Sequence, residues 1–275
     1  MLKYCLLYFL LISTLVHAQK GRSTDSIDVP NNASRGVAFN KQMVLRYGKS
    51  FFSDSRDYVT APLSWNKKQV IVNSSLLAIG GGLFFADQWI HNKVPTATLN
   101  QEKGIKYGLQ YFGNGYYTMP LMAGMFVYGL ANKKERPFQT SLMGVKSFVI
   151  STVITRGLKY ALNRSRPEAN QGSNFWLMGK SPFSVSFPSG HTTGAFAIAS
   201  VLARNYKDKT WVPITSYTIA TGVAVSRLWT KDHWASDVFF GALVGWSVGT
   251  VVTTIDCLPQ KSAWKVTPGG VSYWF

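Results

Sequence analysis

The chain has 275 residues, of which 46% are hydrophobic, and its 29 Lys and Arg against 12 Asp and Glu give a formal net charge of +17. So much apolar and aromatic sequence excludes a disordered chain. Two cysteines are too few for a disulfide scaffold. The basic charge indicates an anionic partner, which on composition alone is nucleic acid, an anionic membrane or a phosphorylated substrate.

The first eighteen residues show the three parts of a secretory signal peptide. Lys3 supplies the positive charge, Leu6 to Leu11 most of the apolar stretch, and Val16-His17-Ala18 the small residues of a cleavage site. An uncleaved membrane anchor is the alternative. We predict that residues 1–18 are removed and that the mature chain is exported, with Cys257 as its single cysteine.

Residues 19–68 are predicted to form a polar leader and an amphipathic segment. Six apolar runs follow, and they predict helices because they are too long for strands and lack alternation with period two. The runs are Val70–Ala86, Gly115–Ala131, Ser141–Leu162, Thr192–Ala203, Trp211–Ser226 and Val238–Ile255. The sequence therefore predicts an all-α bundle of about six core helices in a domain of residues 69–256, with 257–275 as a C-terminal tail.

Only two of these runs, Val70–Ala86 and Val238–Ile255, reach the length that a bilayer-spanning helix needs. The mean hydropathy of +0.02 is low for a protein with many spanning helices. Core helices of a soluble bundle would give the same runs. A bundle partly embedded in a membrane is the interpretation we carry forward.

The first segment that carries chemistry runs from Lys159 to Pro167 and reads KYALNRSRP. On a continuous helix, Lys159 and Arg166 would share one face about 10 Å apart along the axis, so that both cations reach one anion. Pro167 is expected to end that helix. The alternative is a basic helix end that only complements the helix dipole.

The second segment, Pro188-Ser189-Gly190-His191, opens the fourth apolar run. Ser189 is expected to cap the helix, and Gly190 to let a ligand approach the backbone closely. The N–H groups of the first turn would then bind a phosphate, and His191 is placed to donate a proton to a leaving oxygen. A capped helix with a surface histidine is the alternative.

The third segment contains Ser226-Arg227 and, further on, His233 and Asp237. Residues four apart share a helix face, so the carboxylate can keep one ring nitrogen of His233 protonated and leave the other free as a nucleophile or base. Arg227 would point about 120° away on a continuous helix, so the chain is expected to break near Lys231-Asp232. A purely structural His–Asp pair is the alternative.

Together the segments have eleven fixed residues in order, Lys-x6-Arg-Pro, Pro-Ser-Gly-His and Ser-Arg-x5-His-x3-Asp, within positions 159–237. This pattern resembles the type-2 phosphatidic acid phosphatase and vanadium haloperoxidase superfamily, and every motif position matches. The resemblance implies the helical fold of the acid phosphatases and haloperoxidases, and a phosphohydrolase that uses no metal or other cofactor.

The resemblance also implies a role for each site residue. His233 would attack phosphorus to form a phosphohistidine, Asp237 would orient His233, and His191 would protonate the leaving oxygen and then activate water. The residues expected to hold the phosphoryl oxygens are Lys159, Arg166, Ser189, Gly190 and Arg227. A loose phosphoryl transition state needs such positive charge on its equatorial oxygens.

The expected substrate is a phosphomonoester or diphosphate of a lipid, such as phosphatidate, a polyprenyl diphosphate or lipid A. The alternatives are a soluble periplasmic acid phosphatase for small phosphoesters, a vanadium-dependent haloperoxidase, and an inactive binding protein on the same scaffold. Nucleic acid is the least expected partner, because the charge is spread along the chain and export separates the protein from it. A cleaved signal followed by three spanning helices would turn Lys159 to the cytoplasm, whereas the resemblance implies a site that faces outward. A bundle on the periplasmic side of a bacterial membrane, membrane-associated or integral, avoids this conflict and is the expected location.

Overall fold

The computed structural model describes residues 66–96, 108–174, 185–256, 264–267 and 270–273, together with a few single positions between 51 and 104 and at 176. The predicted signal peptide and polar leader lie outside the described residues, as does most of the predicted amphipathic segment.

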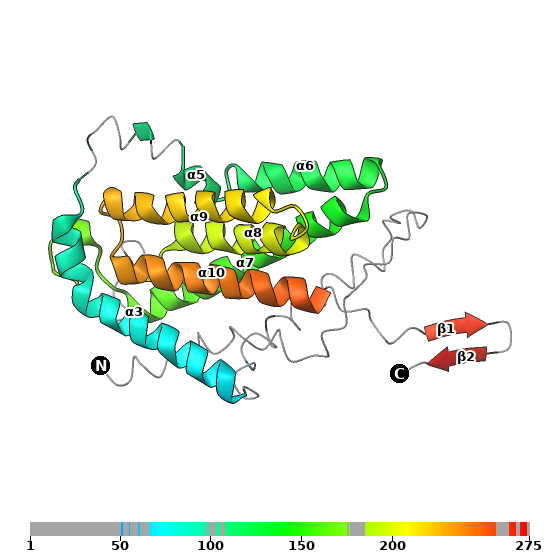
Figure 1. Ribbon diagram of the computed structural model, residues 1–275, viewed down its shortest axis with the longest axis horizontal. Helices are drawn as coiled ribbons and strands as arrows, with labels where there is room; N and C mark the ends of the chain where they lie inside the picture. The colour runs from blue at the N-terminus through cyan, green and yellow to red at the C-terminus, as the bar shows by residue number, and fades with distance from the viewer. Residues whose placement is uncertain are drawn as a thin grey trace.

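Six helices of 14 residues or more form the bundle in the described ranges (Figure 1). They are α3 (Lys67–Lys93), α6 (Thr118–Ala131), α7 (Glu135–Leu162), α8 (Gly190–Asn205), α9 (Trp211–Trp229) and α10 (Ala235–Asp256). Shorter elements are the single turn α5 (Gln110–Gly113), the 3-10 turn η3 (Pro167–Ala169), and the antiparallel strands β1 (Trp264–Thr267) and β2 (Gly270–Tyr273). Each predicted apolar run overlaps one of the six long helices, so the all-α fold class is confirmed.

Helices α8 and α10 pack against each other at the centre of the bundle, with α7 against both and α9 against α8. The core between α7, α8 and α10 includes Met143, Ile150, Val201, Val244 and Val248. Helix α6 packs on α7, and α3 packs on α10. The amino ends of α8 and α10 and the carboxyl ends of α3, α7 and α9 meet at one end of the bundle, on the left of Figure 1.

Glycines bring the backbones of α8 and α10 into direct contact. Gly241 and Gly245 face α8, and Gly249 continues the row one turn further along α10. A Cβ at Gly241 would lie 2.6 Å from the carbonyl oxygen of Ser189, and one at Gly245 would lie closer still to that of Thr193. Side chains are therefore excluded from this line of contact, which fixes the distance between the amino ends of the two helices.

Helix α3 buries mainly polar side chains against the bundle and exposes many of its apolar ones. The residues it buries are Gln69, Asn73, Gly80 and Asp87. Its exposed large hydrophobic residues are Val70, Ile71, Val72, Ile79, Phe85 and Trp89. A surface helix of a water-soluble protein has the opposite arrangement.

Among the described helices, α3 and α10 are long and apolar enough to cross a membrane. They differ in burial, because the apolar window of α10 is 72% buried inside the bundle and that of α3 only 17%. Helix α10 therefore fits a core helix equally well, whereas α3 leaves its apolar surface uncovered by the residues that the structure describes.

Candidate active site

All eight predicted site residues gather where the helix ends meet. His191 lies within electrostatic range of Arg227, His233 and Arg166. His233 lies in turn near Lys159, Arg166 and Asp237. The backbone N–H of Ser189, the residue before Gly190, donates to the carbonyl oxygen of Asp237 at 2.9 Å. Segments up to 78 positions apart in the sequence, from Lys159 to Asp237, thus form one site.

The expectation that Lys159 and Arg166 share a helix face is wrong. Helix α7 ends at Leu162, and Asn163 caps it in the left-handed conformation with φ of 43°, which asparagine tolerates better than most residues. Arg166 is in extended backbone, the conformation that the following Pro167 imposes. Both cations still reach the site, one from the helix and one from the loop.

Lys159 is held by main-chain carbonyls. Its Nζ donates to the carbonyl oxygens of Val185 at 2.7 Å and Ser186 at 3.0 Å. An ammonium group has three N–H donors, so these bonds leave one for a ligand. Burial, opposed by the charge of Asp237 and assisted by that of Arg166, lowers the pKa of Lys159 to about 7.

The two motif arginines keep buried donors without an acceptor. Nε of Arg166 and Nη2 of Arg227 are buried and find no hydrogen-bond partner in the described part of the chain. The other side of each guanidinium faces Asp232, with Nη1 of Arg227 at 3.0 Å and Nη1 of Arg166 at 3.9 Å from its carboxylate. A buried, unsatisfied guanidinium N–H is unfavourable unless a ligand supplies an oxygen.

The second motif begins α8 as predicted, with Ser189 as the capping residue. The hydroxyl of Ser189 does not bond to the backbone of the first turn but accepts a hydrogen bond from Thr192 Oγ1 at 3.0 Å. The N–H groups of Gly190 and His191 belong to the first turn, where a helix has no internal acceptors. Burial and the charge of Arg227 lower the pKa of His191 to about 3, so its ring is neutral at pH 7.

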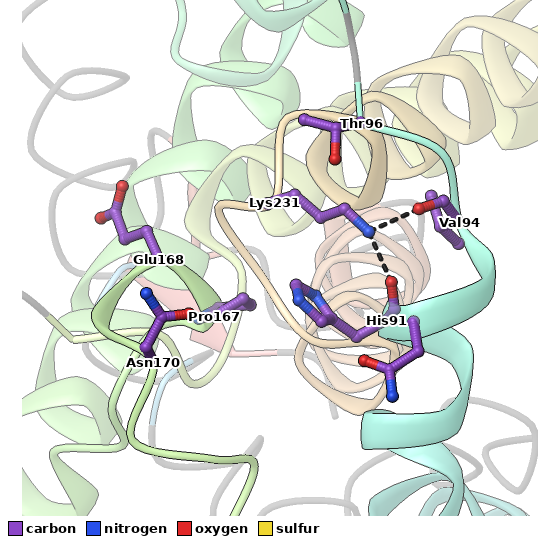
Figure 2. Close-up of a pocket in the computed structure, with 8 residues that line it drawn as sticks. His91, Val94, Thr96, Pro167, Glu168, Asn170 and Lys231 are labelled. Carbon is purple, nitrogen blue, oxygen red and sulfur yellow. Dashed lines mark hydrogen bonds between the residues drawn. The ribbon is translucent and has the colours of Figure 1, made fainter.

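The predicted break in the third motif is confirmed. Helix α9 ends at Trp229, Lys231 is left-handed with φ of 58°, and α10 begins at Ala235. Figure 2 shows the side chain of Lys231 donating to the carbonyl oxygens of His91 and Val94 at the end of α3, each at 2.5 Å. The loop that carries His233 is therefore fixed to α3.

A serine hydroxyl lies between His233 and Asp237. Nδ1 of His233 is 3.8 Å from the carboxylate, too far for a hydrogen bond. Oγ of Ser186 lies 3.3 Å from Nδ1 and donates to Asp237 Oδ2 at 2.5 Å. Because its proton points to the carboxylate, Ser186 can only accept from Nδ1–H, which leaves the Nε2 lone pair free. Burial lowers the pKa of His233 to about 4, although Asp237 opposes this.

Sequence reasoning missed Ser186, and it also missed two charged residues behind Asp237. Burial alone would raise the pKa of Asp237, but Arg164 and the surrounding hydrogen bonds hold it below its usual range. Arg164 Nη1 donates to Asp237 at 2.6 Å, and its Nη2 donates to Asp87 of α3 at 2.7 Å. The available signal was Asp87 itself, a single acidic residue directly after the uncharged run of α3.

An open pocket of about 360 Å³ lies beside the site (Figure 2). Its lining is polar for the most part and consists of His91, Asn92, Val94, Thr96, Pro167, Glu168, Asn170 and Lys231. Pro167 follows Arg166 directly, and Lys231 precedes His233 by two residues. The loops that carry the first and third motifs therefore form part of its wall.

Comparison with known proteins agrees with this geometry. Residues 143–256, which include all three motifs, match the model of the PAP2 superfamily. A lipid A 1-phosphatase of Porphyromonas gingivalis is 37% identical over 135 residues, which are 48% of this chain and 27% of that protein. An undecaprenyl-diphosphatase of Sulfolobus acidocaldarius is 31% identical over 153 residues, which are 54% of this chain and 66% of that protein.

Among solved structures, a transmembrane PAP2-type phosphatidylglycerolphosphate phosphatase from Bacillus subtilis aligns with 77% of this chain and 94% of its own, with a TM-score of 0.45 and 23% identity. The chain spans about a quarter of the length of the Porphyromonas relative and about two thirds of the Sulfolobus relative. The matched region covers every residue of the three motifs. With these motifs complete and gathered in one site, the region of residues 143–256 belongs to the PAP2 superfamily.

Proposed function

We propose that the protein is a metal-independent phosphatase that hydrolyses a phosphomonoester or diphosphate group of a lipid through a phosphohistidine. The observation that carries the proposal is the pair of buried guanidinium donors, Arg166 Nε and Arg227 Nη2, left without an acceptor beside a neutral histidine. A phosphoryl group supplies the oxygens that these donors lack. The relatives with matching sequences are named as phosphatases of lipid A and of undecaprenyl diphosphate.

In the first step, Nε2 of His233 attacks phosphorus and the bond to the leaving oxygen breaks. The positive charge that develops on the ring is balanced by Asp237 through the Ser186 hydroxyl. His191 supplies the proton to the leaving oxygen. The His191 ring alone is neutral at pH 7. An arriving phosphate offsets the charge of Arg227 and raises the pKa of His191, so that the ring takes up a proton when substrate binds.

In the second step, water attacks the phosphohistidine and His191 accepts a proton from it. The P–N bond breaks, inorganic phosphate forms, and His233 returns to its neutral state. In both steps, Lys159, Arg166, Arg227 and the first turn of α8 hold the equatorial oxygens, where the charge of a loose transition state develops.

The arrangement of α3 favours a lipid substrate and a place at the membrane, which we propose is the periplasmic side. Its outward face presents Ile79, Phe85 and Trp89, exposed by 54%, 81% and 65%. Contact with lipid would remove that surface from water. The same observation argues against the soluble acid phosphatase, in which such a face would remain in water.

Phosphate release from two kinds of substrate tests the proposal. The protein in detergent is given phosphatidate in phosphatidylcholine vesicles or p-nitrophenyl phosphate, with EDTA present throughout. We expect EDTA-resistant release with preference for the lipid, and a loss of at least about a thousandfold in His233→Ala. Lys209→Ala, an exposed cation distant from the motifs, serves as the control.

Three results would contradict the proposal in different ways. Unchanged release by His233→Ala would exclude the phosphohistidine. A preference for p-nitrophenyl phosphate would favour the soluble acid phosphatase. Halide oxidation that depends on added vanadate would favour the haloperoxidase.

A further inference from the structure

A buried chain of charges runs from α3 to the nucleophile. Asp87, Arg164, Ser236 and Asp237 have side chains that are fully buried in the bundle. Arg164 lies between the two carboxylates, with Nη2 at 2.7 Å from Asp87 and Nη1 at 2.6 Å from Asp237. Beyond Asp237 lie the Ser186 hydroxyl and His233. This series of charged side chains therefore begins on α3, outside the part of the protein matched by the superfamily model.

Every donor of Arg164 is occupied. Nε and Nη2 also donate to the carbonyl oxygen of Ser173 at 3.0 and 2.7 Å, and Nη1 also donates to Ser236 Oγ at 2.7 Å. The guanidinium lies 4.9 to 5.5 Å from the ring centres of Phe84, Trp176 and Trp234. This packing leaves the guanidinium no alternative position, so it holds Asp237 at a fixed point.

Asp87 is equally saturated, and its bonds reach the start of α10. Its Oδ1 accepts from the backbone N–H of Ser236 at 2.9 Å, and its Oδ2 accepts from Ser236 Oγ at 2.5 Å. Ser236 is the residue directly before Asp237. A carboxylate at this amino end also suits the helix dipole. Asp87 therefore fixes both the charge behind Asp237 and the backbone that carries it.

Together, Asp87, Arg164 and Asp237 carry one net negative charge, which faces His233. The carboxylates of Asp87 and Asp237 carry two negative charges and the guanidinium of Arg164 carries one positive charge. Without Asp87, Arg164 would neutralise Asp237, and a cationic ring at His233 would have no net counter-charge behind it. A buried arginine that loses one of two carboxylates is also left with an unpaired donor.

We propose that Asp87 and Arg164 are positioning residues for the phosphohistidine reaction, acting on His233 through Asp237. The inference rests on the proposed function, because it assigns Asp87 a part in the same reaction. It makes α3 a component of the active site. Neither residue contacts the arginines that would hold the phosphate, so substrate binding should not depend on them.

The test compares Asp87→Asn with Asn73→Ser, a control on the same buried face of α3 whose side chain bonds locally to the carbonyl oxygen of Gln69. For Asp87→Asn we expect kcat to fall about tenfold or more with KM within about twofold, and inhibition by inorganic phosphate to be unchanged. Asp87→Glu, which restores the charge, should recover part of kcat. Asn73→Ser should change thermal stability alone.

A second readout does not require turnover. Isotope-labelled His233 is titrated by NMR in detergent, and the loss of one negative charge in Asp87→Asn should lower its pKa by about half a unit. Equal kcat and equal titration in Asp87→Asn and the wild type would overturn the inference while the phosphatase proposal stands. If the wild type released no phosphate, the proposed function would fail. If the pKa of His233 were then also the same in Asp87→Asn and the wild type, the positioning role of Asp87 and Arg164 would be rejected as well.

Discussion

Burial decides the charge state of the individual site residues. It lowers the pKa of Lys159 to about 7, of His191 to about 3 and of His233 to about 4. Near pH 7 the site therefore holds two neutral imidazoles, and its lasting positive charge comes from Arg166 and Arg227. Lys159 is the cation whose charge changes within the working range of most phosphatase assays.

We predict that substrate capture weakens above pH 7. Because the pKa of Lys159 is lowered, its ammonium is fully charged below pH 7 and loses its proton as the pH rises through that value. A phosphate dianion would then meet one cation fewer, and kcat/KM should fall about tenfold per pH unit on the alkaline side. Measuring kcat/KM from pH 5 to 9 shows the decline.

Lys159→Arg provides the comparison, because arginine stays protonated throughout this range. Its alkaline decline should be absent or displaced to higher pH, even if its maximum is lower. Lys207→Arg, on the turn after α8, should behave like the wild type. Parallel alkaline declines in the wild type and Lys159→Arg would show that another group titrates.

Sequence order and residue type identified the eight motif residues but not the residues that position them. Ser186, Arg164 and Asp87 have no fixed spacing from their partners. Their bonds join residues 51, 73 and 77 positions apart. Such contacts arise only when α3, the loops and α10 pack together, so one sequence read along its length does not indicate them.

At the scale of elements, the apolar runs predicted the helices because they are too long for strands and lack alternation with period two. The helix was expected to continue from Leu162 to Pro167 because no glycine or proline lies between them, and Asn163 alone marks the stop. The break before α10 was predicted correctly, since Arg227 and His233 reach one site only if the chain turns between them. Functional geometry was thus a better guide to that boundary than composition.

We predict that Gly241→Ala uncouples the two histidine segments. The added methyl group would lie 2.6 Å from the Ser189 carbonyl oxygen, a backbone atom that does not move without α8. Overpacking of this kind costs about 1–3 kcal/mol, and displacing Ser189 from the Asp237 carbonyl should reduce phosphate release at least tenfold. Thermal unfolding and phosphate release in detergent measure the two effects.

Gly124→Ala in α6 is the matched control. Nothing in the described structure lies within 4 Å of a Cβ built there. It should leave activity unchanged and raise stability by about 0.5–1 kcal/mol through helix propensity. If Gly241→Ala proved equally harmless, the glycine contact would not set the distance between α8 and α10.

The whole molecule combines an aliphatic core between α7, α8 and α10 with a helix, α3, that buries mainly polar side chains and exposes many apolar ones. Helices α7, α8 and α10 enclose aliphatic side chains, whereas α3 contributes Gln69, Asn73 and Asp87 to the interior. The apolar run of α3 predicted a helix but not its orientation. Orientation follows from the one buried charge, Asp87, which must face its partner Arg164.

We predict that the outward face of α3 holds the protein to the membrane. The wild type should stay with the membrane fraction after carbonate washing. Replacing Ile71, Ile79, Phe85 and Trp89 with glutamine removes about 1.5–3 kcal/mol of transfer free energy at each position. This fourfold variant should be released from the membrane fraction. Ser75→Ala with Gln88→Ala, exposed on the same helix, should release nothing.

Two outcomes of that fractionation would contradict the prediction. Release of the wild type by carbonate would mean that this face does not lie in lipid and would favour a soluble enzyme. Retention of the fourfold variant would show that another part of the chain binds the membrane.

The end of α3 next to the active site has a consequence for how the enzyme meets its substrate. Asp87 and His91 lie in the last two turns of α3, and the Lys231 side chain joins that end to the loop of His233. A lipid beside α3 would therefore present its headgroup at the reacting histidine without leaving its leaflet. Successive turnovers would then occur during lateral diffusion on one vesicle, and the rate would follow the surface mole fraction of the phospholipid instead of its bulk concentration.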